Sequence, residues 1–271
     1  MSNSFYDLIT CRNLGLIDES EQEKIKNSKV AICGLGGIGS PAAEMLVRLG
    51  IGNFSLLDHG TFEPTNMNRQ IYMFTDTDGK WKTDVTEDFF KKINPEVQVR
   101  KYVQINQANV EEFLRGSDVA VLAADAMLPI ILMSRKAREL SIPLVEGWAV
   151  AFGNARVFTN DTPSLEEVYK FPTTGREIED IDEQEQADLL MRSIFDLAET
   201  FPGLTGHYSQ KALERMKEEK IGTTLSPLVW LSSVMMAIET VKIILGKGEL
   251  ALAPSFAVYD PFNFRAFRSE H

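Results

Sequence analysis

The sequence predicts an α/β protein with a Rossmann-like, doubly wound and mostly parallel sheet, helices on both faces, and a helix and strand extension at the C-terminus. Two observations predict this class. Short apolar runs rich in β-branched residues alternate with segments of helical spacing, and the first run ends in a glycine-rich turn. The 271 residues suffice for a full core. We therefore expect residues 1–271 to form one domain, in which 161–221 is an insert or crossover region.

The first three predicted elements form one strand–helix–strand unit. After a short amphipathic lead-in, residues 29–34 have the sequence KVAICG, which is typical of a buried parallel strand. Residues 40–50 carry apolar residues at helical spacing and end at a glycine, and residues 54–58 predict the next strand. A crossover of this kind is right-handed in nearly all known proteins.

The same alternation continues through the following segments. Helices are predicted over 79–93, 110–114 and 129–141, and strands over 97–103, 119–124 and 143–147. Repeated alternation of this kind predicts parallel strands joined by helices that cover both faces of one sheet.

The pattern changes at about residue 161. Residues 161–186 have no clear period, and their acidic run is typical of a solvated surface. Helices are predicted over 187–199, 207–220 and 227–245, and a last strand over 256–260. The helix over 227–245 is nearly long enough to span a bilayer, but Glu239 and Lys242 interrupt it one turn apart, where they can pair. We therefore expect a core or dimer-interface helix rather than a membrane span.

Composition excludes several classes of protein. A net charge of -11, from 28 Lys and Arg against 39 Asp and Glu, disfavours binding to nucleic acid or to anionic lipid. Two cysteines, Cys11 and Cys33, are too few for a disulfide scaffold or a four-cysteine zinc site. The start MSNSFYDLIT lacks the basic and apolar regions of a secretory signal, so a cytoplasmic location is expected.

The glycine turn predicts a nucleotide site. Gly34, Gly36 and Gly39 have the GxGxxG spacing, with Gly37 between them, and the turn joins a strand to a helix. The first glycine permits the turn, the second lets a phosphate approach the backbone, and the third allows close packing. Asp58 follows about 20 positions later and is placed to accept hydrogen bonds from a ribose. The alternative is that the glycines serve packing alone.

The next segment favours a triphosphate over a nicotinamide cofactor. Asn66, Arg69 and Gln70 lie in the loop after the second strand, and Lys82 opens the next helix. A glycine turn holds the diphosphate of a nicotinamide cofactor unaided, whereas added cations suit a triphosphate whose pyrophosphate must leave. Asp125 ends the run VAVLAA and points into the same crevice, where a lone carboxylate is a natural ligand for Mg²⁺.

The order of motifs resembles that of the ThiF/MoeB/ubiquitin-activating-enzyme superfamily. The motifs in this sequence are GLGGIGS, LLD, TNMNRQ, GKWK, INP, AAD, IPLVEG and YDP. The resemblance covers residues 6 to about 160 and about 222 to 268, and leaves 161–221 unmatched. The N-x-x-R-Q element with the G-x-x-K lysine is its most specific part.

The resemblance implies adenylation, in which a carboxylate attacks the α-phosphate of ATP in the presence of Mg²⁺. In this chain Gly36 and the neighbouring glycines would hold the phosphates, Asp58 the ribose, and Asp125 the magnesium ion. The resemblance also implies a homodimer, in which Arg12 would reach the ATP of the partner subunit.

Further roles follow from the same motifs. Asn66, Arg69 and Lys82 would stabilise the transferring and leaving phosphates, with Gln70 in support. Gly60 occupies the position where the family often has a second aspartate, which is a departure at the nucleotide site.

Other departures concern cysteine and zinc. Many bacterial members carry two CxxC pairs, and this sequence has none, so we expect no zinc. Ubiquitin-activating relatives use a cysteine in the crossover region, but this chain has no cysteine after Cys33. Cys33 lies inside a predicted strand, which is typical of a buried filler, and nothing around Cys11 indicates an activated thiol. An enzyme-bound thioester is therefore not expected.

The substrate stays open. The carboxylate is either the C-terminus of a ubiquitin-like protein or a small acid, and the acceptor a sulfur carrier, a partner protein's cysteine or a small molecule. Trp148, Phe171 and residues 203–207 are possible pocket linings, although a structural role is the simpler interpretation. Alternatives are a relative of the threonylcarbamoyl-adenosine tRNA dehydratases, a non-catalytic nucleotide-binding partner protein, and a nicotinamide oxidoreductase.

Overall fold

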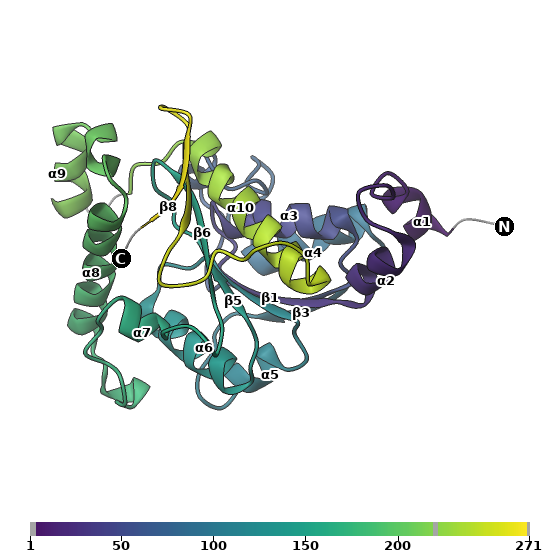
Figure 1. Ribbon diagram of the computed structural model, residues 1–271, viewed down its shortest axis with the longest axis horizontal. Coiled ribbons are helices and arrows are strands. Elements are labelled where there is room, and N and C mark those ends of the chain that lie inside the picture. The colour runs from purple at the N-terminus through teal and green to yellow at the C-terminus, as the bar shows by residue number, and fades with distance from the viewer. Residues whose placement is uncertain (1–3, 219–221, 270–271) are drawn as a thin grey trace.

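In residues 4–218 and 222–269, which the computed structural model describes, the strands form one eight-stranded sheet, and this confirms the predicted α/β class. Their order is β3-β2-β1-β4-β5-β6-β7-β8 (Figure 1). Neighbours from β3 to β5 are parallel, and neighbours from β5 to β8 are antiparallel. The strands are β1 Lys29–Cys33, β2 Asn53–Leu57, β3 Gln98–Tyr102, β4 Val119–Leu122, β5 Leu144–Glu146, β6 Gly153–Phe158, β7 Ala257–Asp260 and β8 Arg265–Arg268.

Helices join the strands and cover both faces. They are α1 Phe5–Thr10, α2 Glu19–Asn27, α3 Gly39–Leu49, α4 Lys82–Ile93, α5 Val110–Leu114, α6 Met127–Glu139, α7 Leu165–Val168, α8 Glu183–Thr200, α9 Gln210–Glu218 and α10 Ser226–Leu245, with 3₁₀ turns η1 Pro64–Asn66, η2 Ile178–Asp180 and η3 Leu204–His207. In Figure 1, α3, α4 and α10 lie on one side of the sheet, and α5 and α6 on the other.

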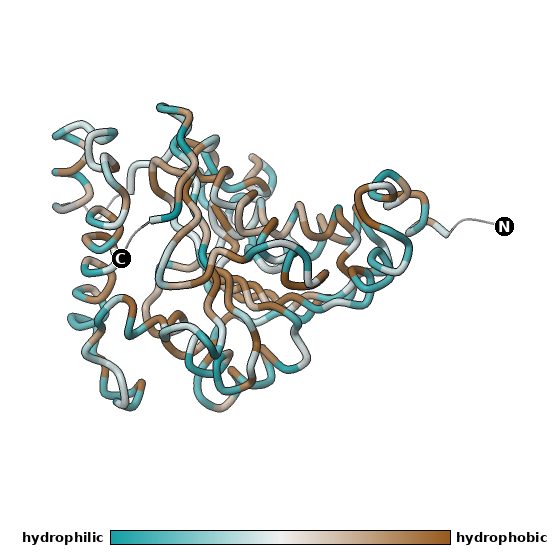
Figure 2. Tube along the Cα trace, viewed as in Figure 1, coloured by the Kyte–Doolittle hydropathy of each residue, from teal (hydrophilic) through white to brown (hydrophobic). Residues whose placement is uncertain are grey.

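Strand β1 shows how the two layers of core arise. Val30 and Ile32 pack into the core that α3, α4 and α10 cover, whereas Ala31 and Cys33 pack into the core that α5 and α6 cover. Successive side chains of a strand point to opposite faces, so a strand buried on both faces is apolar throughout. The brown central strands of Figure 2 show the same property. Cys33 is a buried filler, as predicted, and burial raises the pKa of its thiol.

Two strands were not predicted. Strand β6 is buried along its whole length, but its sequence GNARVF contains polar residues and therefore lacks the apolar pattern of a core strand. Asn154 and Arg156 are tolerated there because other segments supply their hydrogen bonds. Strand β8 is an exposed edge strand of four residues and therefore has little apolar pattern.

Several helix boundaries differ from the prediction. The helix expected from residue 79 begins at Lys82, because Gly79 is in the left-handed region with a φ of +74°. The helix expected over 187–199 begins at Glu183, because Asp182 caps it and acidic residues favour a helix N-terminus. The helix expected over 207–220 begins at Gln210, and residues 219 and 220 lie outside the described residues.

Helix α10 is long and apolar enough to cross a membrane by length and composition. It packs against β6 and α3, so the core of the fold accounts for much of its apolar surface. The predicted pair forms, with Lys242 Nζ 2.6 Å from Glu239 Oε1. Its outer face carries an exposed apolar stripe, which consists of Trp230, Val234 and Ile238.

Candidate functional site

A cleft of about 550 Å³ opens at the carboxyl ends of the parallel strands. It lies where β1 separates β2 and β3 from β4 and β5, which is the switch point at which open α/β sheets bind ligands. Most of the predicted site residues line it: Gly34, Gly36, Gly37, Asp58, Arg69, Gln70, Lys82 and Asp125. The structure therefore brings together residues that are far apart in the sequence.

The glycine turn has the geometry that its spacing predicts. Gly34 has a φ of +93°, and a Cβ atom there would lie 2.4 Å from the carbonyl oxygen of Ala123. A Cβ atom at Gly39 would lie 1.8 Å from the carbonyl oxygen of Gly34. At Gly36 the nearest atom would be 3.8 Å away, so the bare backbone there faces the cleft rather than a neighbour. Thus Gly34 and Gly39 serve the turn and its packing, and Gly36 leaves room for a phosphate.

Asp58 ties the second strand to the glycine turn. Its Oδ2 accepts a hydrogen bond of 2.7 Å from the backbone N–H of Leu35, and its Oδ1 accepts one of 2.8 Å from the backbone N–H of Gly60. The residue is only 9% exposed. Each carboxylate oxygen has a second lone pair, so both bonds are compatible with acceptance from a ribose hydroxyl.

Lys82 brings a positive charge to the cleft wall. Its Nζ lies 3.9 Å from Asp58 Oδ1, which is longer than a normal hydrogen bond, so its donors remain available to an anion. A Cβ atom at Gly60 would lie 3.3 Å from this Nζ. An aspartate at position 60 would lie beside the ammonium group of Lys82 and could pair with it. Glycine at this position leaves the ammonium group available to a ligand.

Arg69 lines the same cleft, but its guanidinium is held by the preceding turn. It donates 3.0 Å to the carbonyl oxygen of Thr65 and 2.8 Å to Asn68 Oδ1. Its aliphatic carbons lie against Gly37, where a Cβ atom would be 3.0 Å away. The stem is thus in the cleft, and the guanidinium must turn to meet a phosphate.

Gln70 supplies an unsatisfied polar group. The residue is 6% exposed, and its buried Oε1 has no hydrogen-bond partner among the described residues. An unpaired buried acceptor costs about 1–3 kcal/mol, so this amide is suited to meet a ligand. Rotation of the amide by 180° presents its NH₂ group instead, and both arrangements serve a nucleotide with hydroxyl donors and phosphate acceptors.

Asn66 and Arg12 do not line the cleft. Asn66 is buried in the 3₁₀ turn η1, where its Oδ1 accepts 3.3 Å from the backbone N–H of Glu63. Its carbonyl oxygen accepts the backbone N–H groups of Arg69 and Gln70, so it shapes the loop that carries them. Arg12 is exposed beyond α1, and its role in a partner subunit stays a prediction.

Asp125 follows β4 and lies exposed in the cleft. Among the described residues no group of three or more His, Cys, Asp or Glu is arranged to hold a metal ion. Magnesium is usually bound through one or two carboxylates together with waters and substrate phosphates. A lone carboxylate beside a phosphate site therefore fits an ion that arrives with ATP.

Apart from Trp148, the remaining wall was not predicted as a site. Val103, Gln104 and Ile105 follow β3, Pro129 lies in α6, and Trp148, one of the possible linings, follows β5. Their common feature is that each lies at or near the carboxyl end of a parallel strand, which the predicted strands already indicated. Phe171 does not line the cleft, because it is buried against Tyr169 with ring centroids 5.3 Å apart. In the segment 203–207, the ring of His207 stacks on Phe262 outside the cleft.

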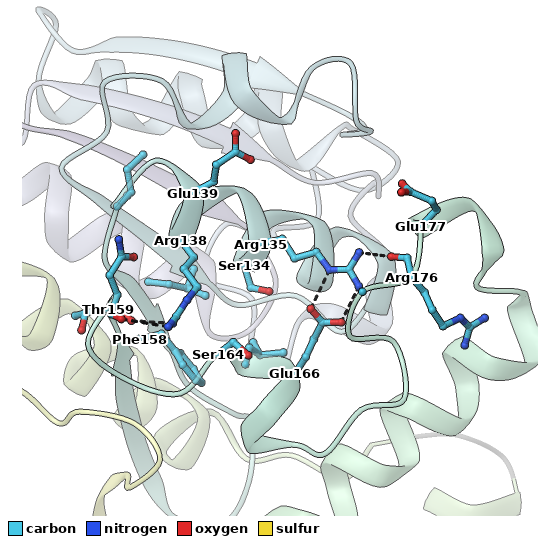
Figure 3. A pocket seen from close by; sticks show the side chains of 15 residues that line it. Ser134, Arg135, Arg138, Glu139, Phe158, Thr159, Ser164, Glu166, Arg176 and Glu177 are labelled. Carbon is cyan, nitrogen blue, oxygen red and sulfur yellow. Dashed lines mark hydrogen bonds and ion pairs between the residues drawn. The ribbon is translucent and has the colours of Figure 1, made fainter.

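A second cavity of about 570 Å³ lies between α6, α7 and the loop before η2 (Figure 3). Arg135 pairs with both carboxylate oxygens of Glu166 at 2.8 Å and also donates to two backbone carbonyl oxygens. Arg138 donates to three carbonyl oxygens of the loop after β6. Both arginines are therefore already paired. Their bonds fasten residues 159–176 to α6, and we assign this cavity a structural role.

Comparison with known proteins gives one family and several relatives. The model of the ThiF family matches residues 10–271. The SAMP-activating enzyme E1 of Haloferax volcanii is 33% identical over 144 residues, which are 52% of this chain and 53% of that protein. The tRNA threonylcarbamoyladenosine dehydratase of Bacillus subtilis is 34% identical over 142 residues, 52% of this chain and 56% of that protein. The chain thus matches about half the length of these relatives.

Solved structures show the same fold. E. coli MccB superposes with a TM-score of 0.68 and 20% identity, over 99% of this chain and 69% of that chain. PaaA superposes with a TM-score of 0.66 and 23% identity, over 98% of this chain and 70% of that chain. E. coli MccB has also been solved with ATP, and that structure superposes with a TM-score of 0.65 and 21% identity, over 93% of this chain and 65% of that chain.

Proposed function

Because the chain belongs to the ThiF family, we propose that it is an ATP-dependent adenylyltransferase, which activates a carboxylate as an acyl-adenylate and releases pyrophosphate. One observation supports this most. Lys82, Arg69 and Asp125 line the same cleft as the glycine turn, so cations and a metal-binding carboxylate flank the expected phosphate position. A fold that bound only a dinucleotide would not need them.

The proposed reaction is an in-line displacement at the α-phosphorus. A carboxylate oxygen of the substrate attacks, the bond from the α-phosphorus to the bridging oxygen breaks, and its electron pair leaves with pyrophosphate. Negative charge develops on the leaving group, and Lys82, which lines the cleft, would neutralise it. Arg69 adds a second cation once its guanidinium leaves Thr65 and Asn68.

The other residues bind and orient the nucleotide. The N-terminus of α3 and the backbone at Gly36 attract phosphate, and Asp58 accepts the ribose hydroxyls. Gln70 donates or accepts through its unpaired amide. Asp125 would hold magnesium, which when bound shields the charge between the phosphates.

We propose a homodimer in which Arg12 reaches the partner's nucleotide. The exposed apolar stripe of α10, with Trp230, Val234 and Ile238, offers a surface for such an interface. Arg12 lies outside the cleft of its own chain, which is compatible with action in the partner.

The acyl substrate is proposed as the C-terminus of a ubiquitin-like protein or as a small acid. The relative that carries the name SAMP-activating enzyme E1 supports the first choice. The acceptor is external, such as a partner protein's cysteine, because Cys33 is buried and Cys11 is exposed outside the cleft. We also propose that the chain needs no zinc and is cytoplasmic.

A second candidate is a dehydratase acting on threonylcarbamoyl-adenosine in tRNA, which the similarity to the Bacillus subtilis enzyme supports. The net charge of -11 weighs against a tRNA substrate. Such an enzyme would require modified tRNA for turnover of ATP. A non-catalytic nucleotide-binding protein would bind ATP without turnover of any kind.

The test is isotope exchange between pyrophosphate and ATP, screened against small acids, small β-grasp proteins and modified tRNA. We expect exchange with one carboxylate substrate, and Asp125→Ala should reduce it by about 10²-fold or more while the fold is kept. Asp76→Ala is the matched control, since Asp76 is an exposed carboxylate outside the cleft. Wild-type exchange in Asp125→Ala would contradict the metal site, and turnover with modified tRNA alone would favour the dehydratase.

A further inference from the structure

Trp148 forms the wall of the cleft on the side away from the expected ribose site. It follows β5, whereas Asp58 follows β2, and strands β1 and β4 lie between them. A nucleotide that extends from Asp58 to the glycine turn therefore leaves the β4–β5 side for the second reactant. Trp148 stands on that side, beyond Asp125.

Trp148 is held at three points. Its backbone N–H donates 2.8 Å to Asn154 Oδ1, and its carbonyl oxygen accepts 2.9 Å from Asn154 Nδ2. Its indole Nε1 donates 2.7 Å to the hydroxyl of Tyr169. Asn154 is fully buried in β6 and holds the backbone of Trp148. Tyr169 holds the indole ring, so neither the backbone nor the ring is free to turn.

Tyr169 is itself held by a buried ion pair between Glu146 and Arg156. Its hydroxyl donates 3.0 Å to Glu146 Oε1, and Arg156 Nε donates 2.6 Å to Glu146 Oε2. All three residues are at most 2% exposed. Burial raises the pKa of Tyr169, so its phenol stays a donor at any working pH. The donors therefore run in one direction, from indole to phenol to carboxylate.

Tyr169 belongs to the segment 161–221, which is fastened to helix α6 on both sides of it. Arg135 of α6 binds Glu166 through both carboxylate oxygens, as Figure 3 shows, and also donates 2.6 Å to the carbonyl oxygen of Thr173. Tyr169 lies between these two anchors in the chain. Its hydroxyl is therefore a fixed point rather than part of a loose loop.

We propose that Trp148 contacts the acyl group of the substrate, and that Tyr169 is a positioning residue that fixes its indole. The segment 161–221 thereby influences the choice of acyl substrate through one hydrogen bond. This inference rests on the proposed function, because it assigns the β4–β5 side of the cleft to the acyl group of an adenylate.

The test uses stable mimics of the adenylate. The probes are 5′-O-sulfamoyladenosine and its N-glycyl, N-hexanoyl and N-benzoyl derivatives, whose dissociation constants are measured by calorimetry. We expect wild type to bind at least one acyl derivative about tenfold or more tightly than the bare compound. Trp148→Ala should abolish that preference, and Tyr169→Phe should reduce it about three- to tenfold, as loss of one hydrogen bond does, with binding of the bare compound unchanged.

The matched control is Tyr6→Phe. Tyr6 is equally buried, accepts a hydrogen bond from Gln22 and donates one to the carbonyl oxygen of Gly50, far from the cleft. This variant should keep the full preference for the acyl derivative. If Trp148→Ala does not fold, Trp148→Phe replaces it, since it keeps an aromatic ring and removes the N–H donor; it should behave like Tyr169→Phe.

Two failures are distinguishable. If wild type binds none of the four compounds, the proposed adenylation is overturned, and this inference falls with it. If the bare compound binds but no acyl derivative is preferred, or the Tyr169 and Trp148 variants keep the preference, only the inference is overturned.

Discussion

Replacement of Asp58 by asparagine tests whether this carboxylate both holds the glycine turn and binds the nucleotide. Asp58 accepts the backbone N–H groups of Leu35 at 2.7 Å and Gly60 at 2.8 Å. Hydrogen bonds to a charged acceptor contribute about 1.5–3 kcal/mol each. The amide oxygen of the introduced asparagine can replace one of them, but its NH₂ group faces the other N–H donor. We therefore expect Asp58→Asn to lower the free energy of unfolding by about 2–4 kcal/mol.

The measurement is urea unfolding followed by circular dichroism, with calorimetry of Mg·ATP binding on the same samples. Binding should weaken by about tenfold or more, because the turn that is expected to receive the phosphates loses two hydrogen bonds to the residue after β2. Asp118→Asn is the control, since Asp118 is an exposed carboxylate that accepts the backbone N–H of Lys29 at 2.8 Å. It should cost less than about 1 kcal/mol. An Asp58→Asn protein as stable as wild type, with unchanged ATP affinity, would refute this reasoning.

Two further predictions concern the glycine turn and the dimer. Gly39→Ala should lower the free energy of unfolding by more than about 2 kcal/mol in a urea titration, because its Cβ would lie 1.8 Å from the carbonyl oxygen of Gly34. Gly36→Ala should fold normally and weaken ATP binding, because its Cβ has room in the fold but would enter the cleft. Equal stability of both variants would contradict the packing role of the third glycine. Mixed dimers of Arg12→Ala and Lys82→Ala subunits should regain pyrophosphate exchange that neither homodimer shows, because one intact composite site forms; absence of rescue in verified heterodimers would argue against action across the interface.

The part of the cleft where a nucleotide is expected was predictable, because its residues follow directly from neighbouring parallel strands. Strand β1, the turn at Gly34 and the start of α3 follow directly from apolar pattern and glycine spacing. The carboxyl ends of parallel strands share one edge, so Asp58 and Asp125 were expected to approach the turn. Lys82 needed only a helix that begins at this edge.

The rest depends on pairings between distant segments. The side chain of Asn66 lies within η1, where it accepts the backbone N–H of Glu63. The sequence motif does not reveal this local bond. Strand β6 escaped detection because Asn154 and Arg156 occupy core positions, where a buried polar group is tolerated only with its partners present. Those partners are Glu146 on β5, Trp148 after it, Ser232 on α10 and the carbonyl oxygen of Pro254, and no periodicity connects them.

This difference bears on how the site works. The expected phosphate side is built from the turn after β1, the segment from residue 58 to the start of α4, and the residues that follow β4. Its geometry therefore depends on segments that the motifs cover. The wall at Trp148 depends on Tyr169, which comes from the segment that the motifs leave unmatched and that α6 fastens through Arg135. Substitutions in that segment can reshape the wall without touching the glycine turn. Under the proposed function, substitutions there are therefore expected to change the choice of carboxylate and to leave ATP binding unchanged.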